Sequence, residues 1–142
     1  MQKRSQMSNH MPTGYSVSVV CISVFGYSLD FDEITRRLGV QPSQTARRVS
    51  RNRRPGEPAC DRWSLSTPLA ETEPLSAHLV WLWEVLKPNL EFLRSLRRTA
   101  EVRIYCGLNS GYSGCRVSFS PDALRLFVQL GIPLGVTIFM AP

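Results

Sequence analysis

One pattern occurs twice in this chain of 142 residues, and it constrains the fold more than any other feature. Each copy has a strand-like run that contains valine, then a Ser or Asp, a short amphipathic segment and Leu-Gly. The copies span residues 17–39 and 115–131. Because Ser and Asp cap helix starts and glycine ends helices, each copy predicts a strand followed by a short helix. Both helices can then lie on one sheet.

The rest of the chain is divided by hydrophobic periodicity and by proline. Apolar spacing predicts a central strand at 16–25 and a helix at 30–38, and it predicts a strand at 62–66 and a helix at 75–99 that Pro88 interrupts. The repeat unit predicts a last helix at 121–130, followed by a strand at 134–139. Residues 40–61 contain three prolines and many arginines, and we expect them to form a long irregular loop.

A hairpin is predicted around the glycines at 107–114. Residues 101–106 and 115–119 alternate between apolar and polar, which is typical of paired strands with one buried face. This register places Ile104 opposite Val117 and Cys106 opposite Cys115 in the core. The opposite face would then present Arg103, Tyr105 and Arg116, a combination of basic and aromatic side chains that can bind nucleic-acid bases.

These elements predict one α+β domain at residues 15–142, preceded by a disordered tail at 1–14. From Trp63 onward the order is strand, helix, strand, strand, helix, strand. That order indicates a ferredoxin-like two-layer sandwich with an extra N-terminal strand–helix unit. We expect a mostly antiparallel sheet of about five strands with its helices on one face.

Charge is concentrated in arginine. The net charge is +6, and fifteen of the seventeen basic residues are arginines. A cluster in the predicted loop is a candidate for binding polyanions, because guanidinium groups pair well with phosphate. The alternative is a solvated loop with no ligand, since a basic run is a weak motif. The cluster consists of Arg47, Arg48, Arg51, Arg53 and Arg54.

Motifs that carry chemistry are scarce. The sequence contains no phosphate-binding loop, dinucleotide fingerprint, nucleophile elbow or zinc-protease helix. His10 falls in the tail, and His78 is expected on the surface of the long helix. The cysteines lack metal-ligand spacing, and we expect Cys106 and Cys115 to be free thiols rather than a disulfide. We therefore expect no catalytic residue, no metal and no cofactor.

Three segments resemble one family. They are Phe31-Asp-Glu-Ile-Thr-Arg-Arg-Leu-Gly-Val-Gln-Pro42 followed by Arg62-Trp-Ser-Leu65, then residues 79–96, then Val117-Ser-Phe-Ser-Pro-Asp-Ala-Leu124 with Leu130-Gly-Ile132. Together they resemble the bacterial domain-of-unknown-function family 4279 over residues 15–139. The resemblance implies a small α+β domain and carries no catalytic residues.

The sequence favours a cytoplasmic, non-enzymatic binding module that recognises a protein partner, for instance in immunity or phage conflict. The alternative is weak binding of nucleic acid or another polyanion through the arginine-rich loop 47–54. An enzyme of unrecognised type is the third hypothesis. No membrane association is expected, because no apolar run approaches the ~20 residues that cross a bilayer.

Overall fold

A computed structural model describes residues 14–49, 59–111 and 114–140. Most of the predicted tail therefore lies outside the described residues. Five strands form one sheet: β1 (Tyr15–Gly26), β2 (Gln44–Val49), β3 (Cys60–Ser66), β4 (Glu101–Ser110) and β5 (Val136–Met140). The helices are α2 (Phe31–Leu38), α3 (Leu75–Leu86), α4 (Leu90–Leu96) and α5 (Arg125–Leu130), with single 3₁₀ turns η1 (Lys87–Asn89) and η2 (Asp122–Leu124).

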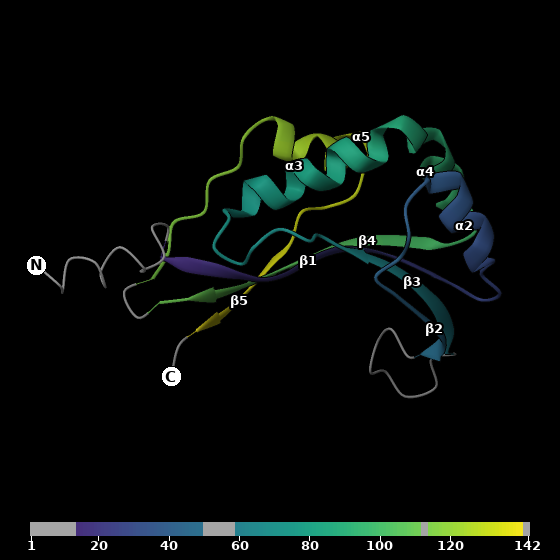
Figure 1. Cartoon of the computed structure of the whole chain (residues 1–142), viewed down its shortest axis with the longest axis horizontal. Coiled ribbons are helices and arrows are strands. Elements are labelled where there is room, and N and C mark those ends of the chain that lie inside the picture. Colours follow the sequence, from purple (N-terminus) through teal and green to yellow (C-terminus); the bar gives the residue numbers. More distant parts are fainter. Residues whose placement is uncertain (1–13, 50–58, 112–113, 141–142) are drawn as a thin grey trace, which may run out of the picture.

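The sheet has the strand order β2-β3-β1-β4-β5 and is mostly antiparallel. Strand β1 lies in the middle, as its apolar sequence predicts, and pairs with β3 on one side and β4 on the other. The exception to the antiparallel arrangement is β5, which runs parallel to β4 at the edge. Figure 1 shows β1 running between β3 and β4 along most of the molecule.

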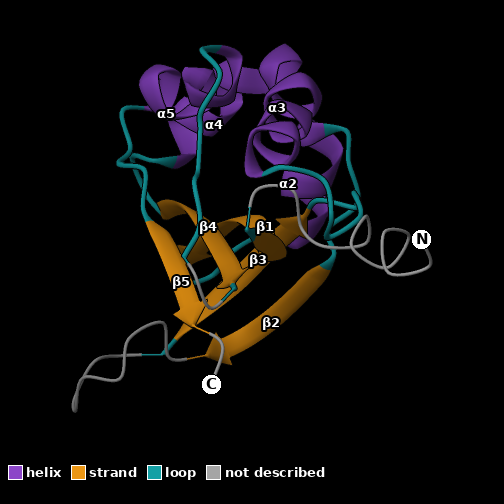
Figure 2. Ribbon diagram, turned by 90° about the vertical axis from the view of Figure 1, so that its left-hand side faces the viewer, coloured by secondary structure: helices purple, strands orange, loops and turns teal. Residues whose placement is uncertain are grey.

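All four helices lie on the same side of the sheet (Figures 1 and 2). The buried residues of β1 that face them alternate along the strand, as one covered face requires. Val20, Ile22 and Val24 pack with the leucines of α3 into a single core. Among the described residues, no helix is long and apolar enough to cross a membrane.

The two repeated helices end as the sequence predicts. Gly39 and Gly131 both adopt the left-handed backbone conformation and terminate α2 and α5. At the first helix start, Asp30 Oδ1 accepts a hydrogen bond from the Glu33 N–H at 3.0 Å. At the second, Ser120 Oγ accepts from the Ala123 N–H at 3.2 Å, whereas Asp122 pairs with Arg125. The cap is therefore Asp in one copy and Ser in the other.

The interruption of the long helix at Pro88 is confirmed. Pro88 lies in η1, between α3 and α4, because proline lacks the N–H that would continue the helical hydrogen-bond ladder. Asn89 Nδ2 donates to the Leu38 carbonyl at 3.1 Å and so ties this break to the end of α2.

The predicted hairpin is wrong. Residues 115–119 form no strand, and β4 continues through the expected turn to Ser110. Ile104 lies opposite Ile22 of β1, not Val117. β4 pairs with β1 on one side and, from Cys106 to Ser110, with β5 on the other. The segment 115–119 leaves the sheet and contacts α3, where Ser76 Oγ donates to the Ser118 carbonyl at 2.8 Å.

The predicted irregular loop at 40–61 is also wrong in part, because it contains β2. This strand pairs with β3 at the edge of the sheet. Most of its residues are polar and exposed: Gln44, Thr45, Arg47 and Arg48. This composition suits an edge strand, but it lacks the apolar alternation by which strands are predicted from sequence.

The ferredoxin-like order is not confirmed. It requires consecutive paired strands at 101–106 and 115–119, and the second of these is absent. What holds is the coarser expectation of a mixed α+β domain with a five-stranded, mostly antiparallel sheet.

Replacing Ile104 with alanine tests the observed core. The side chain is buried between β1 and the helices, so Ile104→Ala should lower the free energy of unfolding by about 2–5 kcal/mol. Urea denaturation measures the change. The control, Val128→Ala on the exposed side of α5, should stay within about 0.5 kcal/mol of the parent.

The two helix starts provide a second test. Asp30→Ala should cost about 1 kcal/mol of unfolding free energy, because it removes the acceptor for the Glu33 N–H. Asp122→Ala should cost less, since Ser120 supplies the cap there. Equal losses in thermal denaturation at matched pH would show that the caps are assigned wrongly.

Candidate functional site

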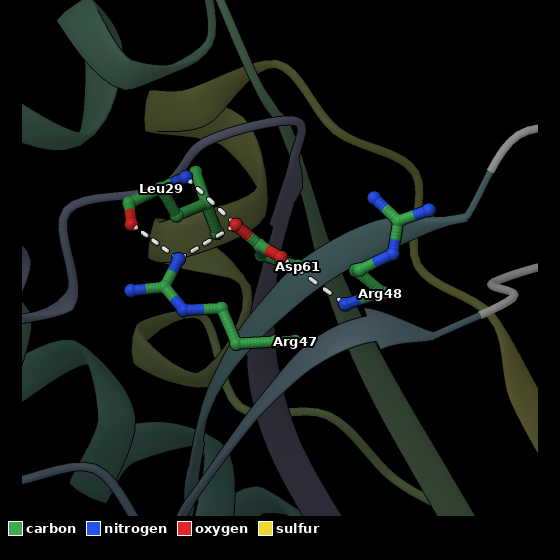
Figure 3. A network of polar contacts seen from close by, with 4 residues as sticks. All are labelled: Leu29, Arg47, Arg48 and Asp61. Carbon is green, nitrogen blue, oxygen red and sulfur yellow. Dashed lines mark hydrogen bonds and ion pairs between the residues drawn. The ribbon is translucent and has the colours of Figure 1, made fainter.

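The arginine cluster is divided by the structure. Arg47 and Arg48 belong to β2, while Arg51, Arg53 and Arg54 lie outside the described residues. Arg47 Nη1 lies 2.7 Å from Asp61 Oδ2 and donates to the Leu29 carbonyl at 2.7 Å (Figure 3). Its guanidinium also stacks over the ring of Phe31, 3.9 Å from the centroid. The charge of Arg47 is therefore paired within the chain.

Asp61 is the centre of this network. Its carboxylate accepts from Arg47 and from the backbone N–H groups of Leu29 and Arg48, both at 3.1 Å. Burial alone would raise the pKa of Asp61, but the hydrogen bonds from Arg47, Arg48 and Leu29 and the arginine charge outweigh it. The net result is a pKa below the ordinary value of 3.8. Asp61 thus joins β2, β3 and the segment before α2.

Arg48 has a different role in the same network. Its φ of 61° lies in the left-handed region, at a bulge between Ala46 and Val49 where the β2–β3 register shifts. The backbone N–H turns toward Asp61, and Figure 3 shows the guanidinium pointing away from that carboxylate. Of the two described arginines, Arg48 is the one whose charge the network leaves to solvent.

The second predicted group is divided as well. Arg103 and Tyr105 lie two residues apart on β4, on the sheet face that carries no helix, and both are exposed. Arg116 is exposed too, but it lies in the segment between β4 and η2 rather than in the sheet. Arg103 Nε lies 2.5 Å from Glu101 Oε2, and its guanidinium lies 5.6 Å from the centroid of the Phe25 ring.

A cleft of about 550 Å³ lies beside β4, and the sequence did not predict it. Strand β5 pairs with β4 only from Cys106 to Ser110, so no described strand pairs with residues 102–105 on that side. The cleft opens there, between the first half of β4 and the loop that leads into β5. Its walls combine apolar groups with two arginines and one acid: Val102, Ile104, Ile132, Leu134, Arg97, Arg103 and Glu101.

The edge strand β5 is unusually apolar for its position. Ile138 is 44% exposed, Phe139 48% and Met140 64%, and the strand has no charged residue. Edge strands usually carry charge, proline or a bulge that discourages pairing with another chain. The apolar run Val136–Met140 is visible in the sequence. It could not indicate an exposed edge strand, because a buried strand would have the same composition.

The four cysteines form no disulfide. Cys21, Cys60, Cys106 and Cys115 are all free. Burial raises the pKa of the Cys106 thiol to about 12, which keeps it protonated and unreactive.

His78 is buried, so its predicted surface position is wrong. It contacts Thr67 Oγ1 through Nδ1 at 2.5 Å and the Ala70 carbonyl through Nε2 at 3.1 Å, and it fixes the loop before α3.

The chain belongs to the family described as Domain of unknown function (DUF4279), whose profile matches residues 15–140. The predicted resemblance is thereby confirmed over nearly the whole described domain. Searches of curated proteins and of solved structures find no match.

The Asp61 network predicts a specific pH dependence. A carboxyl with a lowered pKa in the folded state stabilises the fold above its unfolded pKa and loses that contribution as pH falls through the folded value. Asp61→Asn should therefore reduce stability at pH 7. The difference from the parent should shrink as pH falls below about 3.8.

Chemical denaturation between pH 7 and pH 3 measures this difference. Asp122→Asn is the matched control, because that carboxylate also pairs with an arginine but is well exposed. A gap between parent and Asp61→Asn that stays constant over the whole range would contradict a structural role for the Asp61 charge.

Proposed function

We propose that this member of the DUF4279 family is a non-enzymatic binding module that recognises a protein partner. In this proposal an extended segment of the partner adds to the sheet at the β4–β5 edge. The observation that carries it is the half-occupied edge of β4, where a cleft stands in place of a strand. Strand addition is a common mode of peptide recognition, in which backbone hydrogen bonds give affinity and side-chain pockets give specificity.

The dimensions of the vacant edge suit a short extended segment. Residues 102–105 would span roughly 14 Å at about 3.4 Å per residue. The cleft volume of about 550 Å³ falls within the range of about 300–1,000 Å³ that is typical of ligand pockets. A segment of four or five residues therefore fits this edge without moving β5.

The chemistry of the cleft indicates what the segment should carry. Ile132 and Leu134 offer apolar contacts opposite β4. Arg97 and Arg103 place two guanidinium groups at the border of the cleft, and Arg103 already pairs with Glu101. Arg97 donates one N–H to the Leu130 carbonyl and has further donors. A partner segment with apolar side chains and a carboxylate would satisfy both kinds of group.

Strand β5 extends the same surface. By their register with Leu108 and Ser110, Ile138 and Met140 lie on the sheet face that points toward the helices, and both are exposed. A partner strand paired with β5 would cover them. The binding surface thus comprises the cleft and the outer edge of β5, and we name it the β4–β5 edge.

Recognition by strand addition needs no catalytic residue, which agrees with a non-enzymatic role. We place the role in the cytoplasm, as the sequence predicts, and the four free thiols support a reducing environment. The partner's identity and a function in immunity or phage conflict stay predictions.

The alternative, weak polyanion binding through the arginine-rich residues 47–54, also stays a prediction. Arg48 supports it, because its guanidinium points away from Asp61. Arg47 supports it less, because its charge is already paired. Replacing only Arg48 by serine should lower polyanion binding more than replacing Arg47, if these residues bind polyanions at all.

The proposal is tested by capturing the partner with the full chain from native cells and purifying the complex. Hydrogen exchange should then show new protection at residues 102–105 and in β5. Ile138→Lys should weaken the complex at least tenfold, because a buried, unpaired cation opposes pairing at this edge.

Val128→Lys is the matched control, since it adds the same charge on an exposed position of α5, away from the edge. It should bind the partner like the parent. Sedimentation of the isolated chain shows whether the partner is a second copy. Protection confined to other surfaces, or equal binding by Ile138→Lys, would refute the proposed site.

A further inference from the structure

The sheet face that carries no helix (Figures 1 and 2) is a second surface, and it shares Arg103 with the cleft of the β4–β5 edge. We name it the open face and define it by the side chains that alternate outward from the strands. The cross-strand register places Arg62 beside Phe25, and Cys21 beside Tyr105. On β5, Phe139 shares the face, because it is in register with Asn109 of β4. The members used below are Phe25, Arg62, Arg103, Tyr105 and Phe139.

Two aromatic rings on this face are available to a ligand. Tyr105 is 39% exposed, and its ring lies against the backbone at Gly107: a Cβ added there would lie 3.0 Å from Cε2 and 3.3 Å from the hydroxyl oxygen. The glycine thus lets the ring lie close to the sheet and present its other side. Phe139, on the neighbouring strand, is also largely exposed.

The charges around these rings are positive. Arg103 is exposed beside Tyr105 and lies over Phe25. Arg62 adds a second guanidinium, whose Nε is buried without a hydrogen-bond partner. By the register of the described strands, Glu101 is the one acid on the open face, and Arg103 already pairs with it. The open face therefore combines exposed rings with cations and lacks a surplus of acidic groups.

From this arrangement we infer that the open face binds single-stranded nucleic acid. Unpaired bases would stack on Tyr105 and Phe139, while Arg103 and Arg62 would contact phosphates. Stacking tolerates any base, and arginine contacts with phosphate carry no sequence information, so binding should be weak and without sequence preference. A duplex hides its base faces and should bind less well.

The inference differs from the protein-binding proposal, because its stacking residues Tyr105 and Phe139 occupy outward positions of the sheet, although Arg103 also borders the cleft of the β4–β5 edge. It also differs from the sequence prediction in its residues. Phe139 replaces Arg116, since residues 115–119 are not part of the sheet. Either function can hold without the other.

Fluorescence anisotropy with labelled twelve-nucleotide DNA and RNA strands of mixed sequence, at low salt, tests the inference. Tyr105→Ala and Phe139→Ala should each weaken binding about fivefold or more, while Tyr105→Phe should retain it, because the ring alone stacks. Arg103→Ser should weaken binding and reduce the slope of log affinity against log salt by about one.

Two controls match these variants. Arg125→Ser removes an arginine of the helix layer that pairs with Asp122 much as Arg103 pairs with Glu101. Tyr27→Ala removes an exposed tyrosine that follows β1 and lies outside the strands. Both should bind the strands within twofold of the parent. Circular dichroism and melting curves confirm that every variant is folded.

Several results would overturn the inference. One is no detectable binding of either strand at low salt. Another is binding that Tyr105→Ala and Phe139→Ala leave unchanged, or duplex and heparin binding as tight as that of single strands. These last outcomes would indicate a purely electrostatic surface, such as the arginine-rich residues 47–54, rather than a stacking face.

Discussion

The position of β1 between β3 and β4 determines the architecture. β1 runs antiparallel to both neighbours, so β3 and β4 are parallel to each other and α3 must cross from one to the other. That crossover covers one face of the sheet, and α4 and α5 extend the same layer. Because β1 is hydrogen-bonded on both sides and Val20, Ile22 and Val24 are buried, a change in its register would disturb every layer.

The two edges of the sheet are built in opposite ways. At one edge, β2 is polar and bulged, and the carboxylate of Asp61 ties it to β3 and to the segment before α2. At the other edge, β5 is short and apolar and leaves half of β4 uncovered. The first edge carries features that discourage pairing with another chain, whereas the second lacks them. This asymmetry is the structural basis for placing protein recognition at the β4–β5 edge.

The parts of the fold that sequence predicted are those set by local chemistry. Helix starts, helix ends and the helix break depend on single residues and their nearest turn. Asp30 caps α2, Gly39 and Gly131 end α2 and α5, and Pro88 interrupts the long helix, as their residue types predict. The hairpin prediction was wrong because the alternation in residues 115–119 indicates only that one side of the segment is buried. It does not indicate whether the segment pairs with a strand or packs against a helix. Strand β2 was missed because its edge position removes the apolar signal.

The candidate sites were predictable only in part, for the same reason. Arg103 and Tyr105 were found because their alternation on β4 is correct even though their expected partner strand is not. Phe139 and the cleft depend on which strand lies next to β4, and no local pattern contains that information. Pairing of Arg47 with Asp61, fourteen residues apart, likewise follows from the β2–β3 register rather than from composition.

The pairing of β1 with β4 has a consequence for synthesis on the ribosome. Partners in this pair, such as Phe25 and Glu101, are roughly 75 to 95 residues apart, which gives the fold many long-range contacts and predicts slow folding. At about 5–20 residues per second, β1, the longest strand, emerges roughly 4 to 19 seconds before its second neighbour exists. During that interval one side of β1 has no partner from its own chain. The nascent protein is therefore most vulnerable to aggregation at its N-terminal strand, and a chaperone that holds extended apolar segments would find its target there.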